Sequence, residues 1–192
     1  MRRAKTLPYL TLGTAGILLM LAMLPTGVWQ TYAAASPMST TQRPYMFSRL
    51  ADPFPGQETP LSTARAALPF DIQMPQVLPP NLSLTHVRLV KEVKLVYLIF
   101  TTSKLAEPFS AEDVLSSGGI IMMQSWDAAD PTEFISSRVE QSNGLWKDVN
   151  INGGLGVASF GKIHWWKNNV HYEILALQGI EQLTAIANSV GR

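Results

Sequence analysis

The stretch from Lys162 to Leu175 constrains the fold most, because it predicts a β-hairpin with two chemically different faces. Asn168-Asn169 predicts a two-residue turn, since asparagine tolerates the positive φ angles that tight hairpin turns need. A three-residue loop would shift the register by one residue and break the grouping below. The two-residue register pairs Trp166 with His171, Trp165 with Tyr172, His164 with Glu173, and Ile163 with Ile174.

The two faces of this hairpin predict different roles, because successive side chains of a strand point to opposite sides of the sheet. The apolar face is expected to lie in the core and consists of Ile163, Trp165, Val170, Tyr172 and Ile174. The polar and aromatic face is expected to hold the binding residues and consists of Trp166, His164, His171 and Glu173.

The N-terminal segment predicts export. Arg2, Arg3 and Lys5 precede a charge-free run from Leu10 to Trp29, and small residues end at Ala35. This order is typical of a secretory signal peptide cleaved after Ala35. The alternative is an uncleaved membrane anchor through residues 10–29, which has about the 20 residues needed to span a bilayer. Either reading places the rest of the chain outside the cytoplasmic membrane, secreted or anchored to its outer face.

Amino-acid composition divides the chain into three parts. Residues 1–35 are the predicted signal or anchor, residues 36–60 a linker rich in Pro, Ser and Thr, and residues 61–192 a single domain. The whole chain carries 15 Lys+Arg and 14 Asp+Glu, so removal of the basic N-terminus leaves a mildly acidic domain. Such a domain is a poor candidate for nucleic-acid binding. The absence of cysteine excludes disulfides, thiolate chemistry and Cys-ligated metals.

The domain sequence predicts an α+β fold, a mostly antiparallel twisted sheet with helices packed on one face. The C-terminal helix is expected after the Trp-rich hairpin, because Ile180, Leu183, Ile186 and Val190 repeat at helical spacing. Residues 127–144 are predicted to be a long polar excursion or a weak helix. The other expected helices cover 62–68, capped by Ser62, and 111–116, capped by Ser110; the other expected strands cover 70–74, 83–91, 94–102, 120–126, 146–151 and 155–160.

The order of these segments resembles the bacterial exported domains grouped as domain of unknown function 4367. The resemblance rests on Pro75–Leu82 before a Val-rich strand, a following strand with Tyr97, the run Val149–Gly153, the Trp-bearing hairpin, and Ile180–Val190. It covers about residues 61–191 and implies an extracytoplasmic domain, often attached to a membrane segment. The family supplies no catalytic residues to carry over.

The candidate site residues have several interpretations. His164, His171 and Glu173 could form a zinc-like cluster, but solvated surface histidines are the preferred interpretation, because structural zinc sites usually have four enclosed ligands. We therefore predict no metal and no cofactor. Trp166, together with Trp126 or Trp146, could form an aromatic platform for a sugar, a peptide or a lipid headgroup. The alternative for these tryptophans is packing in the core or at the rim of the sheet.

These observations predict a non-enzymatic binding or sensory module of the cell envelope, exported or tethered to the membrane. The expected partner is an envelope protein or an apolar or glycan ligand. One alternative is a periplasmic-type carrier of lipid or lipoprotein, with the apolar strands lining a cavity. Another is a metal-dependent hydrolase that uses His164, His171 and Glu173.

Overall fold

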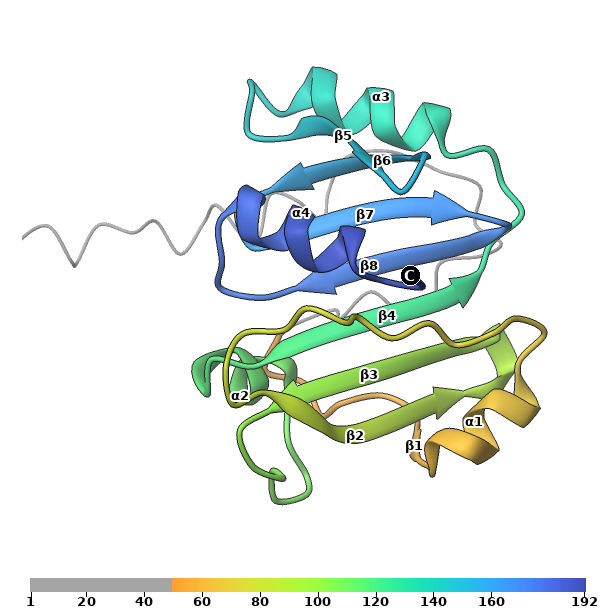
Figure 1. The fold of residues 1–192 in the computed structure, drawn as a ribbon, viewed down its shortest axis with the longest axis vertical. Coiled ribbons are helices and arrows are strands. Elements are labelled where there is room, and N and C mark those ends of the chain that lie inside the picture. The colour runs from red at the N-terminus through yellow and green to blue at the C-terminus, as the bar shows by residue number, and fades with distance from the viewer. Residues whose placement is uncertain (1–49) are drawn as a thin grey trace, which may run out of the picture. The chain divides into compact units, whose positions relative to one another are not determined.

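The computed structural model describes residues 50–192, so the predicted signal or anchor segment and the first part of the predicted linker lie outside the described residues. The described residues form one eight-stranded antiparallel sheet with helices, which confirms the α+β fold (Figure 1). The elements are β1 (Gln57–Glu58), α1 (Leu61–Ala67), β2 (Ser83–Val90), η2 (Lys91–Val93), β3 (Leu95–Thr101), α2 (Ala111–Ser116), β4 (Ile120–Trp126), α3 (Thr132–Gln141), β5 (Lys147–Ile151), β6 (Gly154–Ser159), β7 (Lys162–Lys167), β8 (Val170–Leu175) and α4 (Ile180–Asn188).

The sheet consists of two meanders, β1 to β4 and β5 to β8, in the order β1-β2-β3-β4-β8-β7-β6-β5. The outer strand of one meander, β4, pairs with the outer strand of the other, β8 (Figure 1). The β7–β8 ladder has the predicted register: His164 pairs with Glu173, and Trp166 pairs with His171. Asn168 and Asn169 both have positive φ, as the two-residue turn requires.

The main core lies on the face of the sheet that α1, α4 and the segment 68–82 cover (Figure 1). The apolar face of the hairpin belongs to this core, as predicted, and Trp165 stacks on Tyr172 with ring centroids 4.9 Å apart. Leu183 and Ile186 of α4 are buried against it, which confirms the predicted apolar stripe of the C-terminal helix.

The other two helices cover the opposite face. Alternate residues of β3 belong to two different cores, and Tyr97 and Ile99 pack with Val114 of α2 on this second side. Farther along the sheet, Phe134 of α3 packs with Trp166 of β7. The expected packing of helices on one face therefore describes α1 and α4, while α2 and α3 lie on the other. The physical reason is that β3 is apolar throughout, so both of its faces must be covered.

The predicted strand at 70–74 is wrong. This segment crosses the main-core face as irregular chain, and its backbone is bound at Gln73 by a side chain instead of a strand. The Gln73 N–H donates to Oε1 of Gln124 at 2.9 Å, and Nε2 of Gln124 donates to the Gln73 carbonyl at 2.6 Å. Gln124 is fully buried in β4, so its amide replaces one rung of a β-ladder.

Residues before Leu61, the predicted start of the domain, also pack with the fold. Phe54 is buried, its N–H donates to the Phe109 carbonyl at 2.8 Å, and β1 pairs with β2. The prolines of this region exclude a central strand but allow a short edge strand, and that is the position of β1. The first helix begins at Leu61 after Pro60 and has no side-chain cap, so the predicted cap at Ser62 is not formed.

The structure also tests the predictions for two helices that lie between strands, α2 and α3. Ser110 caps α2 as predicted, in a capping box with Asp113. The polar excursion 127–144 contains α3, so the helical alternative is correct for residues 132–141. Within residues 50–192, none of the helices is both long and apolar enough to cross a membrane.

Candidate functional site

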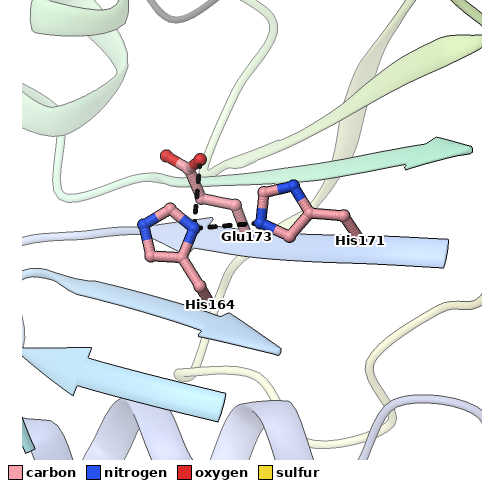
Figure 2. A group of neighbouring side chains, drawn as sticks. All are labelled: His164, His171 and Glu173. Atoms are coloured by element: carbon pink, nitrogen blue, oxygen red, sulfur yellow. Dashed lines mark hydrogen bonds and ion pairs between the residues drawn. The ribbon is translucent and has the colours of Figure 1, made fainter. Parts of the chain in front are cut away.

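The candidate site lies on the face of the β7–β8 hairpin opposite the main core. His164 of β7 and His171 of β8 are not direct partners, but they lie diagonally across the ladder on the same face. Their rings lie nearly parallel, at 12°, with centroids 5.3 Å apart. Glu173, the direct partner of His164, projects beside both imidazoles (Figure 2).

Three polar atoms converge at this site. Nδ1 of His164 lies 3.0 Å from Nε2 of His171 and 3.5 Å from Oε2 of Glu173 (Figure 2). The first contact is a hydrogen bond in which the tautomers decide which ring donates. The site thus brings together the residues that the alternating pattern placed on one face.

The second carboxylate oxygen of Glu173 has a separate partner. Nζ of Lys162 lies 2.8 Å from Oε1 of Glu173, and the side chain of Glu173 is 10% exposed. Because the ammonium binds one oxygen, the carboxylate is held with its other oxygen toward His164. A buried carboxylate held in this way keeps a fixed orientation toward the imidazoles.

Aromatic side chains enclose the cluster. Phe134 of α3 contacts the ring of His164 edge-on at 5.4 Å, and Trp146 lies 5.6 Å from the same ring. Trp166 stacks on His171 at 4.3 Å. His164 is only 3% exposed, and Glu173 beside it is only 8% exposed. The interpretation of His164 as a solvated surface histidine is therefore wrong, because α3 and the residues after it cover this part of the sheet.

The loop before α3 is fixed to the hairpin. Nε1 of Trp166 donates to Oδ2 of Asp127 at 3.3 Å, and the Asp127 N–H donates to the Asn169 carbonyl at 2.8 Å. Asp130 accepts hydrogen bonds from the side chain and the backbone N–H of Thr132, and these bonds lower the pKa of its carboxyl. An ionised aspartate at this position also interacts favourably with the positive end of the helix dipole.

The interpretation of Trp166 as part of an exposed aromatic platform is wrong. This side chain is only 9% exposed and packs with Phe134 and Trp146 in a small cluster under α3. Trp126 is 38% exposed, at the end of β4. The rim alternative therefore describes Trp126, while Trp166 is a packed residue that stacks on His171.

Sequence reasoning missed a second cluster, formed by Glu58, His86 and Glu107. His86 is buried in β2, and its Nδ1 lies 3.3 Å from Oε1 of Glu58 in β1. The predicted strand 83–91 contains His86, so this residue could be found from the sequence. Glu58 lies in the predicted linker, so the position of Glu58 beside β2 is not expected from the sequence.

In this second cluster one imidazole nitrogen of His86 accepts a hydrogen bond, and the other faces a carboxylate without forming a hydrogen bond. The Leu105 N–H donates to Nε2 of His86 at 3.1 Å, so the ring carries its proton on Nδ1, which faces Glu58. Glu58 also lies near Lys104, and Glu107 pairs with Arg88 at 2.6 Å. The Arg88–Glu107 pair and the Leu105 hydrogen bond hold the loop 102–108 against β2.

A surface hollow of about 450 Å³ lies beside Trp166, lined by the turns at 152–154 and 167–169 and by Asp127. Its polar groups are bonded to one another: Oδ1 of Asp127 accepts from the Ala129 N–H, and Nδ2 of Asn152 donates to the Val190 carbonyl. The hollow is therefore a weaker candidate than the cluster of His164, His171 and Glu173.

Comparisons of this chain with protein-family models, with curated proteins and with solved structures found no match. The resemblance to domain of unknown function 4367 stays a prediction.

Proposed function

We propose that this chain is a non-enzymatic binding module of the cell envelope, and that it binds its ligand through the cluster of Lys162, His164, His171 and Glu173. The proposed location at the cell envelope rests on the basic N-terminus followed by the charge-free run from Leu10 to Trp29. The binding role rests on one observation: these ionisable side chains lie together on one face of the β7–β8 hairpin, with His164 and Glu173 buried.

Such a cluster is costly for a fold, which is why it supports a functional role. Burying charged and polar groups is unfavourable, and replacing a buried ion pair with well-packed apolar residues is often neutral or stabilising. The surrounding patch of Phe134, Val157 and Trp166 is apolar. Apolar side chains at the two histidine positions would continue that patch, so the imidazoles are better explained by a ligand than by packing.

The two alternatives from the sequence have less support. A lipid carrier would need apolar strands that line a cavity, whereas both faces of β3 are packed against side chains of the two larger cores. A hydrolase would need a pocket that holds its substrate against the catalytic groups, whereas the hollow beside Trp166 is not lined by His164, His171 or Glu173.

The proposal is tested by thermal unfolding of the full chain with defined envelope components. Peptidoglycan fragments, anionic lipid vesicles and divalent metal salts are added separately to the wild type and to His164→Leu/His171→Leu. We expect one class to raise the Tm of the wild type and to leave the variant unchanged. A variant at least as stable as the wild type without ligand supports the functional interpretation. If no class shifts the wild type, or if the variant responds equally, this site is not the binding site.

A further inference from the structure

We propose that His164, His171 and Glu173 bind one divalent transition-metal ion, such as Zn²⁺. This inference rests on the proposed function and names the class of its ligand. It replaces the expectation of no metal, which depended on solvated histidines.

The first argument is the arrangement of lone pairs. Nδ1 of His164, Nε2 of His171 and Oε2 of Glu173 all point into one small space (Figure 2). A metal ion at the centre would accept a lone pair from each of the three atoms in place of these contacts.

The second argument is distance. Metal–nitrogen bonds of about 2.0–2.1 Å in tetrahedral geometry place the ligand atoms of one site roughly 3.3–3.4 Å apart. The separations of 3.0 Å between the two imidazole nitrogens and 3.5 Å between His164 and Glu173 lie on either side of this value. Ligand atoms from all three residues lie within 4.8 Å of one another. Small side-chain adjustments would suffice to complete the site.

The third argument is the ligand set, which selects the class of metal. Two imidazoles and one carboxylate suit Zn²⁺, Ni²⁺ and Cu²⁺, whereas Mg²⁺ and Ca²⁺ prefer oxygen ligands. Lys162 holds Oε1 of Glu173 and thereby orients Oε2 toward the imidazoles. Hydrogen-bonded partners of this kind fix the orientation of metal-binding carboxylates in proteins. Three protein ligands leave a tetrahedral position for an exogenous group.

The cluster of Glu58, His86 and Glu107 provides an internal comparison. It has the same number of candidate ligands, but Nε2 of His86 accepts from the Leu105 N–H and Nδ1 carries the proton toward Glu58. A metal at Nδ1 would have to displace that proton while Nε2 stays engaged. We therefore assign the metal to the hairpin cluster alone.

The test uses the full chain without a polyhistidine tag, stripped with EDTA and titrated with ZnCl2 by calorimetry. We expect one equivalent of Zn²⁺ to bind, and His164→Gln, His171→Gln and Glu173→Gln each to weaken binding by at least about tenfold. The matched control, Glu58→Gln/Glu107→Gln, removes both carboxylates of the other cluster and should leave the affinity unchanged. Excess MgCl2 should not displace Zn²⁺.

Cobalt substitution keeps the inference testable if a variant fails to fold. Co²⁺ added to the stripped wild type should give the intense visible absorption of a tetrahedral ion, and Zn²⁺ should abolish it. Substoichiometric Zn²⁺ binding by the wild type, octahedral Co²⁺ spectra, or equal binding by folded His171→Gln would overturn the inference. If Zn²⁺ fails but another class in the thermal panel protects the wild type and not the leucine variant, the metal is wrong and the binding module stands.

Discussion

Nδ1 of His164 and Nε2 of His171 lie 3.0 Å apart, although each residue faces a different partner across the β7–β8 ladder. Diagonal neighbours of an antiparallel pair are ordinarily about 7–8 Å apart at their backbones, so only long side chains meet in this way. Nδ1 of His164 also lies 3.5 Å from Oε2 of Glu173, its direct partner across the ladder. The hairpin therefore builds a three-residue site from local sequence alone.

Removing the charge of Glu173 tests how far that site depends on its carboxylate. Glu173→Gln keeps the shape of the side chain but leaves the Lys162 ammonium without its anion. We expect the free energy of unfolding to fall by about 1.5–3 kcal/mol, the range for hydrogen bonds to charged groups. Urea denaturation at neutral pH measures the loss.

The control is Glu58→Gln, at a side chain that is 38% exposed and pairs with His86 and Lys104. An exposed ion pair contributes less than about 1 kcal/mol, so this variant should lose less stability than Glu173→Gln. Equal losses would mean that burial does not strengthen the Lys162–Glu173 pair.

The amide of Gln124 should be essential for holding the segment 70–74 on the sheet. Gln124→Leu removes both hydrogen bonds to the Gln73 backbone and leaves its N–H and carbonyl without those partners. We expect a loss of about 1–3 kcal/mol in stability and faster amide exchange in residues 70–75. Hydrogen exchange read by mass spectrometry checks the position, with Gln182→Leu on the exposed side of α4 as the control. Unchanged exchange in 70–75 would contradict the assigned role.

The capping box of α2 predicts a pH dependence. Hydrogen bonds from the side chain and then the backbone N–H of Ser110 lower the pKa of Asp113 below its ordinary value of 3.8. A lowered carboxyl pKa stabilises the fold above the ordinary value, and this contribution is lost as the pH falls through the lowered pKa. Ser110→Ala should cost about 1 kcal/mol at neutral pH. Its difference from the wild type should shrink in acid.

Urea midpoints from about pH 6 downward measure this effect, because the contribution is lost as the pH falls through the lowered pKa of Asp113. The control is Ser116→Ala in the same helix, whose hydroxyl donates to the Glu112 carbonyl at an exposed position. If the difference in urea midpoint between Ser110→Ala and the wild type stays constant with pH, the stabilisation by the Ser110 cap does not depend on the ionisation of Asp113.

The docking of α3 should depend on Phe134. This ring contacts His164 and Trp166, and the Arg138 guanidinium lies 5.2 Å from its centroid. Phe134→Ala should lower stability by about 3 kcal/mol and raise amide exchange throughout residues 132–141. If a metal binds His164, exchange in 132–141 should slow on Zn²⁺ addition in the wild type. Glu133→Ala, at an exposed position of the same helix, is the control.

Local patterns account for what could be predicted. The Asn168-Asn169 turn and the alternation of apolar side chains set the β7–β8 register, and both are properties of neighbouring residues. The cap of α2 by Ser110 is local in the same sense. The burial of His164 could not be predicted, because it depends on Phe134, which lies in a mostly polar segment far away in sequence.

The remaining errors have the same origin. The segment 70–74 has the alternation of a strand, but the buried Gln124 binds its backbone from another part of the chain. Glu58 lies in a proline-rich run, and its position beside His86 depends on the short edge pairing of β1 with β2. Interactions between distant segments decided each case.

The joining of the two meanders has a consequence for synthesis. Strand β4 is strongly apolar in sequence, and its partner β8 follows only after β5, β6 and β7. During synthesis the N-terminal part of the chain is made first, so the first meander has β4 as an unpaired apolar edge until β8 is made. An edge of this kind promotes aggregation. Chains that end before Val170 would keep that edge permanently, so incomplete products of this protein should be insoluble and readily degraded.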